Sequence, residues 1–305
     1  MLVCIFVLLL NFAALALSAE NPATLRSLSS VPSSYYKHLV VFGDSYSDNG
    51  HPRNKSYWVP PPPYLGGRTS NGYMWNEYLA KHFGANLHNY AYSGATADNS
   101  IVFRPVPSVN QQLDLYYTDC AKNGKITLDP AKTLHAIWIG VNDLFDIFFN
   151  KLNAEKYEQS TKAIGKSLKN LYEHGARQFL LLNIPPIEHM PVVSEKTDGD
   201  PKEIAEFRER VQEYNEMLER ALLEFLAKTD GDAHLVLFDS FIMFDKIINR
   251  PPPDFCDVEH ACYYRGVVCS KPNCYLWWDT WHPTTYMHGR IADAIFRGWK
   301  LISQP

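Results

Sequence analysis

The sequence predicts a single α/β domain, a three-layer α/β/α sandwich around a parallel sheet of about five strands. Five short apolar runs are each bounded by Gly, Pro, Asn or Asp, which is typical of fully buried parallel strands. Amphipathic helical patterns lie between these runs, and strands that alternate with such helices form a right-handed, doubly wound sheet. The expected strands are residues 38–42, 86–91, 134–140, 178–184 and 234–239.

The helical patterns follow the period of an α-helix. Apolar residues recur one turn apart over residues 164–172, just before Gly175, and at steps of three and four over residues 204–225. A further helix is expected from Thr284 to Lys300. These helices are long enough to cover the faces of the predicted sheet.

Composition supports a folded domain and excludes one class of partner. The chain has 305 residues, of which 46% are hydrophobic and 20% charged, and its formal net charge is −4. Such a chain can bury a large core as one domain, and no repeat or low-complexity tract is visible. Nucleic acids are bound through clustered Lys and Arg, and the sequence has no such basic stripe, so we expect no nucleic-acid partner.

The first 19 residues resemble a signal peptide. They are uncharged and apolar, and they end in small side chains that predict cleavage after Ser18 or Ala19. An uncleaved membrane anchor is the alternative, because this segment lacks the Lys or Arg of a typical signal. No later stretch is long and apolar enough to span a bilayer, so we expect no stable membrane insertion. The sequence thus predicts a secreted protein.

The rest of the chain divides into two parts. Residues 20–36 are rich in Ser, Pro and Asn and are expected to form a leader lying over the surface, ahead of one globular domain at 37–305. Asn54 begins an Asn-Lys-Ser sequon for N-glycosylation, which has meaning only in the secretory route. Nothing in the sequence indicates an oligomer, and we expect a monomer.

The cysteines also fit an extracellular protein. The chain has six, of which Cys4 lies in the predicted signal peptide and Cys120 stands apart, expected as a buried free thiol. The other four fall within nineteen residues, at intervals unlike the paired spacing of zinc sites, so two disulfides are favoured over a metal. The four clustered cysteines are Cys256, Cys262, Cys269 and Cys274. Their spacing alone leaves three disulfide pairings open.

Three loops that follow predicted strands carry polar residues that could do chemistry. They are residues 43–45, residues 93–96 and residues 140–143, with the sequences Gly-Asp-Ser, Ser-Gly-Ala-Thr and Gly-Val-Asn-Asp. In an open α/β sheet, ligands bind outside the carboxyl ends of the strands, where the strand order reverses. We therefore expect these loops to converge at one edge of the sheet.

Ser45 and His282 are the candidate nucleophile and base. A serine hydroxyl is inert without a base, and the alternative is that Ser45 or Asp44 merely caps the next turn. His282 follows Asp279 by three residues, a spacing at which the carboxylate can accept from one ring nitrogen and leave the other free as a base. An Asp-x-x-His pair is common by chance, so the pairing with Ser45 carries the prediction.

Acyl transfer also requires hydrogen-bond donors for a developing oxyanion. Gly94 would let a backbone N–H approach a ligand, Asn142 carries a side-chain amide, and the Ser45 N–H is a third donor. A turn glycine and a turn asparagine are the alternative interpretations of the first two. The joint presence of nucleophile, base and donors favours a hydrolytic site.

Together these residues resemble one known family. The segments GDSYSDNG, SGAT, IGVND and DTWHPT, in this order, are similar to the four sequence blocks of the SGNH (GDSL-type) hydrolases. The resemblance implies Ser45 as nucleophile, Gly94, Asn142 and the Ser45 amide as oxyanion hole, and His282 as base oriented by Asp279. It also implies a flavodoxin-like fold, and it implies no metal or organic cofactor. Tyr46 replaces the leucine of the Gly-Asp-Ser-Leu motif.

The resemblance also bears on the disulfides and the substrate. Similarity to secreted fungal-type esterases implies a Cys262–Cys269 link and hence a Cys256–Cys274 link. The Pro- and Gly-rich residues 48–72 are expected to wall the cleft. Aromatic side chains offer flat faces for a sugar ring or an acyl chain, although core packing is an equal alternative for Trp75 and Trp277. These side chains are Tyr57, Trp58, Tyr64, Trp75, Trp277, Trp278 and Trp281.

The predicted reaction is hydrolysis of small carboxylic esters. No long apolar lid is visible, which favours an acetyl or other short acyl group on carbohydrate. Two alternatives stay open: a lipase or phospholipase that acts on lipid esters, and a carbohydrate-binding protein that has lost catalysis.

Overall fold

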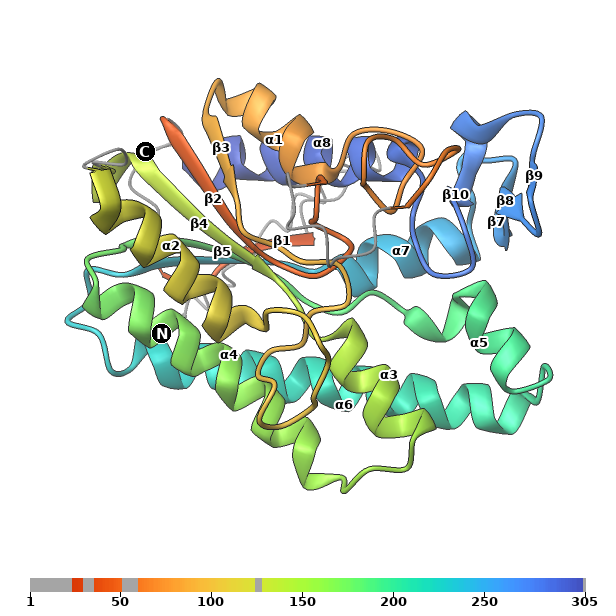
Figure 1. Cartoon of the computed structure of the whole chain (residues 1–305), viewed down its shortest axis with the longest axis horizontal. Coiled ribbons are helices and arrows are strands. Elements are labelled where there is room, and N and C mark those ends of the chain that lie inside the picture. The colour runs from red at the N-terminus through yellow and green to blue at the C-terminus, as the bar shows by residue number, and fades with distance from the viewer. Residues whose placement is uncertain (1–23, 30–35, 51–59, 124–127, 304–305) are drawn as a thin grey trace, which may run out of the picture.

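The structure is a computed structural model, and it describes residues 24–29, 36–50, 60–123 and 128–303. The side chains of residues 120–123 are outside this description. The predicted signal peptide, Asn54, Tyr57 and Trp58 therefore lie outside the described residues, as does the side chain of Cys120. Figure 1 shows a central sheet with helices packed on both sides, the predicted three-layer sandwich.

The central sheet has six strands in the order β1-β6-β5-β4-β2-β3. All neighbouring pairs are parallel except β1 with β6. The five parallel strands match the five predicted from the sequence. The strands are β1 (Leu25–Ser27), β2 (His38–Gly43), β3 (Asn86–Asn89), β4 (Thr133–Trp138), β5 (Gln178–Leu182) and β6 (His234–Phe238).

The sixth strand corrects one expectation. We expected residues 20–36 to lie over the surface and the sheet to begin after them, but β1 pairs antiparallel with β6, from Leu25 opposite Phe238 to Ser27 opposite Val236. Leu25 is buried, and its side chain packs on Gly298 so closely that a Cβ there would lie 2.9 Å from the Cβ of Leu25. The described part of the leader is thus an edge strand of the domain.

Eight α-helices lie within the described residues. Several begin at a side chain that accepts a backbone N–H: Asp200 caps α6, Asp239 caps α7 and Thr284 caps α8. The helices are α1 (Trp75–Phe83), α2 (Val109–Asn123), α3 (Val141–Phe149), α4 (Glu155–Glu173), α5 (Pro191–Lys196), α6 (Pro201–Leu226), α7 (Ser240–Asn249) and α8 (Thr285–Ile302), with 3-10 turns at Pro130–Lys132, Ile187–His189 and Pro272–Cys274. None of these helices has the length and apolar character needed to cross a bilayer.

Alternate residues of each strand feed two separate cores. Along β2, Leu39 and Val41 join the core under α1, α7 and α8, whereas Val40 and Phe42 join the core under α2, α4 and the C-terminal half of α6. Both faces of the sheet are therefore apolar, which explains why the strands appear in the sequence as continuous apolar runs. Figure 1 shows α1 and α8 on one side of the sheet and α2, α4 and α6 on the other.

The segment before α8 is held by two disulfides. Cys256 is bonded to Cys274 and Cys262 to Cys269, so the pairing that the family resemblance implied is confirmed. The Cys262–Cys269 bond closes a small hairpin of β8 (Tyr263–Tyr264) and β9 (Val267–Val268). Next to it, β7 (Asp257–Ala261) pairs in parallel with β10 (Tyr275–Trp277), directly before Asp279.

The strand order fixes the place of the site. Counted along the chain without β1, the parallel strands lie in the order 2-1-3-4-5, the flavodoxin-like order, whose direction reverses between β2 and β4. Ser45 follows β2 and Asn142 follows β4, so both lie at the switch point. The predicted convergence of the loops thus follows from the topology.

Candidate active site

Ser45 stands on a tight turn at the end of β2. Gly43 passes so close to β4 that a Cβ at this position would lie 2.3 Å from the Trp138 carbonyl oxygen, which only glycine avoids. Asp44 Oδ1 accepts the Tyr46 N–H at 2.9 Å, and the Ser45 carbonyl accepts from Thr69 Oγ1 at 2.7 Å. Asp44 therefore caps the turn, and the Ser45 hydroxyl remains available for contacts with other residues.

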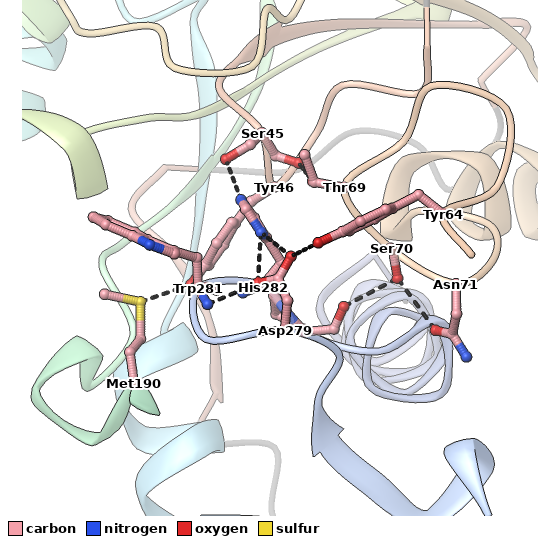
Figure 2. A network of polar contacts seen from close by, with 11 residues as sticks. Ser45, Tyr46, Tyr64, Thr69, Ser70, Asn71, Met190, Asp279, Trp281 and His282 are labelled. Carbon is pink, nitrogen blue, oxygen red and sulfur yellow. Dashed lines mark hydrogen bonds and ion pairs between the residues drawn. The ribbon is translucent and has the colours of Figure 1, made fainter. Parts of the chain in front are cut away.

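The Ser45 hydroxyl meets the predicted base. Ser45 Oγ lies 3.0 Å from His282 Nε2, and His282 Nδ1 lies 2.8 Å from Asp279 Oδ2 and 2.9 Å from Asp279 Oδ1 (Figure 2). With a proton on Nδ1 donated to the carboxylate, Nε2 has its lone pair toward the serine. The three residues form a continuous hydrogen-bonded chain from hydroxyl to carboxylate.

Asp279 is fixed as an anion by its donors. Its Oδ1 also accepts the N–H groups of Trp281 at 2.7 Å and His282 at 2.8 Å, and Oδ2 accepts the Tyr64 hydroxyl at 2.9 Å. Burial acts to raise the pKa of Asp279, but the charge of His282 and these hydrogen bonds outweigh it and hold the pKa below its ordinary value. The carboxylate therefore stays ionised and keeps the imidazole oriented.

Two tyrosines support this pair from opposite sides. Tyr64 reaches Asp279 from the segment after residue 59, as Figure 2 shows. Tyr46, at the position of the motif leucine, donates its hydroxyl to the Trp281 carbonyl at 2.8 Å and packs its ring edge-on near the His282 ring. The contacts of Tyr64 and Thr69 agree with the expectation that residues 48–72 border the cleft, as far as these are described.

Gly94 and Asn142 come together at the same edge of the sheet. Gly94 has φ +85°, a conformation that favours glycine, in the loop after β3. Asn142 lies in the first turn of α3, and its Nδ2 donates to the Ala95 carbonyl at 2.8 Å. An amide NH₂ has two hydrogens, so this bond anchors the side chain and leaves one N–H for a ligand.

Two buried carboxylates that we did not single out hold these loops together. Asp48 Oδ2 accepts the Ser93 N–H at 2.7 Å, which joins the Ser45 loop to the Gly94 loop. Asp143 accepts the Ala97 N–H at 3.1 Å and the Ser160 hydroxyl at 2.8 Å, which joins the Gly94 loop to α3. Both lie inside the quoted sequence blocks, so the blocks themselves are the signal that could have identified them.

Asp44 differs from the other carboxylates of the site. It is fully buried, and its Oδ2 has no hydrogen-bond partner among the described residues. Burial raises the pKa of Asp44 to about 7, although the Tyr46 N–H and the charge of His282 act in the opposite direction. Burial therefore disfavours the charged form of this carboxyl, unlike that of Asp279.

Of the five expected aromatic cleft residues that the structure describes, three belong to the core. Trp75 and Trp277 are fully buried and Trp278 is 2% exposed. Trp75 donates its Nε1–H to Ser47 Oγ at 3.1 Å, and Trp277 donates to the Val258 carbonyl at 3.1 Å. The other two of these five, Tyr64 and Trp281, lie beside the site.

The site has the parts for acyl transfer. A hydroxyl, an imidazole and a carboxylate in this order are the constellation of a serine hydrolase, and the loops that carry Gly94 and Asn142 end at the same edge of the sheet as Ser45. Among the described residues, no group of three His, Cys, Asp or Glu side chains is arranged to hold a metal ion.

Comparison with known proteins assigns the family. The model of the GDSL-like lipase/acylhydrolase family matches residues 39–295. The chain belongs to this family, and it is a carboxylic-ester hydrolase.

Several characterised relatives are similar over most of this chain. An acetylesterase from Thermothelomyces thermophilus is 29% identical over 87% of this chain and 88% of its own. A phosphatidylcholine-sterol acyltransferase from Aeromonas hydrophila is 30% identical over 88% of this chain and 74% of its own. A thermolabile hemolysin from Vibrio parahaemolyticus is 28% identical over 84% of this chain, which spans only 62% of the hemolysin's length.

Solved structures are more distant. An acetylxylan esterase from Geobacillus stearothermophilus has 16% sequence identity and a TM-score of 0.47, with 87% of this chain and 94% of that chain covered.

Proposed function

We propose that this protein is a secreted serine esterase that removes short acyl groups, chiefly acetyl, from carbohydrate through an acyl-enzyme on Ser45. The observation that carries the proposal is the 3.0 Å contact between Ser45 Oγ and His282 Nε2, with Asp279 behind the imidazole. A serine whose hydroxyl proton can be accepted by an oriented imidazole becomes a nucleophile.

The first half-reaction forms the acyl-enzyme. Ser45 Oγ attacks the ester carbonyl carbon while its proton moves to His282 Nε2, and the carbonyl π electrons move to the oxygen. The resulting oxyanion is bound by the N–H groups of Ser45 and Gly94 and by the remaining N–H of Asn142 Nδ2. When the oxyanion collapses, the C–O bond to the alcohol breaks, and His282 gives its proton to the leaving alkoxide.

The second half-reaction releases the acid. Water takes the place of the alcohol and gives a proton to His282 Nε2 as its oxygen attacks the acyl carbon. The same donors hold the second oxyanion, and collapse breaks the bond to Ser45 Oγ, which regains its proton from His282. Asp279 stays ionised throughout and stabilises the imidazolium in both steps.

A short acyl group on carbohydrate is the substrate class that fits best. The acetylesterase relative matches this chain over nearly its whole length, which supports acetyl as the acyl group. The two disulfides and the predicted signal peptide support secretion. Outside the cell, a secreted enzyme would meet acetylated carbohydrate.

Lipid esters are the second candidate substrate. The phosphatidylcholine-sterol acyltransferase relative favours it, since its name specifies a lipid acyl donor. The same chemistry at Ser45 would serve either substrate, so the two candidates differ in the groups that bind the acyl chain and the alcohol.

The test is kinetic and uses the whole mature chain. The parent is compared with Ser45→Ala on p-nitrophenyl esters of increasing chain length, on acetylated xylan and on phosphatidylcholine vesicles. We expect the highest kcat/KM among the p-nitrophenyl esters for acetate, measurable release of acetate from xylan, and a loss of kcat on the order of 10⁴-fold in Ser45→Ala. Preference for long chains and phosphatidylcholine would establish the lipid alternative, and an active Ser45→Ala would refute the mechanism.

A further inference from the structure

An open cavity of about 670 Å³ lies on the outer side of Asp279. Tyr64 and Asp279 form one wall of it, and the disulfide-closed hairpin supplies Tyr263, Tyr264 and Arg265. Glu195, near the end of α5, faces the hairpin across it. A second cavity of about 490 Å³ also includes Glu195 and Tyr264 in its lining, so the two are neighbours along one groove.

We propose that this cavity binds the sugar units next to the esterified one, on the alcohol side of the scissile bond. The inference rests on the proposed function and names the part of the substrate that the enzyme holds in addition to the acyl group. It assigns binding to Tyr263, Tyr264, Arg265 and Glu195, with no part in proton transfer.

The chemistry of the reaction places the alcohol beside His282, whose partner Asp279 belongs to the cavity lining. His282 Nε2 must protonate the leaving alkoxide, so the alcohol oxygen has to lie within hydrogen-bond reach of that nitrogen. Ser45 Oγ lies 3.0 Å from His282 Nε2, and His282 Nδ1 lies 2.8 Å from Asp279 Oδ2. One imidazole ring therefore separates the nucleophile from the carboxylate that lines the cavity. An oligosaccharide that binds one unit at His282 can therefore place a neighbouring unit in the cavity.

The lining residues suit a carbohydrate better than a lipid. Tyrosine presents an apolar ring face and a hydroxyl, the combination that a sugar ring with its C–H and O–H faces requires. Tyr264 is 41% exposed, and the Arg265 guanidinium lies over its ring, 5.0 Å from the centroid. Glu195 adds an acceptor for sugar hydroxyls. Three charged side chains line this open cavity, Glu195, Arg265 and Asp279, and they would be costly to cover with an acyl chain.

The hairpin is built as a rigid platform. The Cys262–Cys269 disulfide closes it, and the N–H groups of Cys262 and Tyr263 donate to the carbonyls of Trp277 and Trp278, at 3.0 and 2.6 Å. The Tyr263 ring stacks on Trp278 and meets Tyr64 edge-on. The three binding residues of the hairpin are therefore fixed to the segment that leads into Asp279, and little order has to be gained there on binding.

The test compares two substrates in three variants. The parent, Tyr264→Ala and Arg265→Ala are assayed on acetylated xylo-oligosaccharides and on p-nitrophenyl acetate, whose small alcohol does not reach the cavity. Tyr73→Ala is the matched control, because Tyr73 is 54% exposed and lies outside the cavity. We expect the ratio of the two kcat/KM values to fall about tenfold or more in both cavity variants and to stay at the parent value in Tyr73→Ala. An unchanged ratio in both cavity variants would overturn the inference.

A binding measurement separates this inference from the proposed reaction. Unacetylated xylo-oligosaccharides are titrated calorimetrically into the parent and the same variants, with unfolding curves to verify that each variant is folded. Binding by the parent and Tyr73→Ala that weakens in Tyr264→Ala supports the cavity, even if no ester is hydrolysed. Absence of binding by a parent that does hydrolyse p-nitrophenyl acetate refutes the cavity and leaves the reaction at Ser45 intact.

Discussion

Asn142 has two amide hydrogens, and the bond to the Ala95 carbonyl at 2.8 Å uses one of them. The side chain therefore links two loops and keeps a second hydrogen, which we propose is donated to the substrate oxyanion. We predict that Asn142→Ala lowers kcat on p-nitrophenyl acetate by roughly 10² to 10³-fold, the usual effect of removing one oxyanion donor. Asn110→Ala, at an exposed asparagine on α2, is the control. A value of kcat near the parent's in Asn142→Ala would remove Asn142 from the oxyanion hole.

At the residue scale, the sequence predicted that Ser45, Asp279 and His282 meet, but it did not predict the residues that support them. Ser45, His282 and Asp279 carry recognisable chemistry in recognisable spacing. The hydrogen bond from Tyr64 to Asp279 joins residues 215 positions apart, and no local sequence pattern predicts a contact between residues so far apart. The buried tryptophans were expected in the cleft but lie in the core. The sequence around an aromatic residue near a site does not indicate whether its side chain faces the solvent or the core.

The edge strand β1 is the element on which the sequence and the structure differ most. It has only three residues, and one of them, Leu25, is buried, so neither alternation nor an apolar run is detectable. Its partner β6 lies some two hundred residues further along the chain. The five parallel strands were predictable because burial on both faces makes each of them a continuous apolar run.

We predict that β1 contributes to the stability of the whole domain. Leu25→Ala should lower the free energy of unfolding by about 2–3 kcal/mol, since the cavity left against Gly298 and α8 cannot easily collapse. Arg26→Ala is the matched control on the same strand. Its partly exposed ion pair with Glu219 should contribute less than about 1 kcal/mol. Equal effects of the two variants in urea denaturation would show that β1 is not packed as described.

At the scale of the whole molecule, the fold brings the two ends of the chain to one edge. Ser45 follows the first parallel strand, whereas Asp279 and His282 precede the last helix, α8, which packs on α1. The topological switch point between β2 and β4 leaves room for a ligand between their loops. The contact between Ser45 and His282 therefore joins segments from both halves of the chain, 237 positions apart.

A buried histidine in α8 makes global stability depend on pH. His288 is fully buried, and neither ring nitrogen has a hydrogen-bond partner among the described residues. Burial lowers the pKa of His288 to about 3, below its ordinary value of 6.5. The folded state thus binds fewer protons than the unfolded state, so this group's contribution to stability is lost as the pH falls below about 6.5.

We predict that His288→Leu reduces this loss. Between pH 7 and pH 4, the parent's free energy of unfolding should fall by about 3 kcal/mol more than that of His288→Leu, at 1.36 kcal/mol for each pKa unit. His174→Leu, an exposed histidine at the end of α4, is the control and should follow the parent. Urea unfolding at both pH values measures the difference, and parallel behaviour of the parent and His288→Leu would contradict the prediction.

The central claim is that Ser45 is the nucleophile, and covalent labelling tests it most directly. The parent is incubated with a fluorophosphonate, and intact-mass measurement is followed by peptide mapping. The account predicts one adduct per chain, on Ser45, with none in Ser45→Ala and much slower labelling in His282→Ala. An adduct on another residue, or equal labelling of the parent and Ser45→Ala, would contradict it.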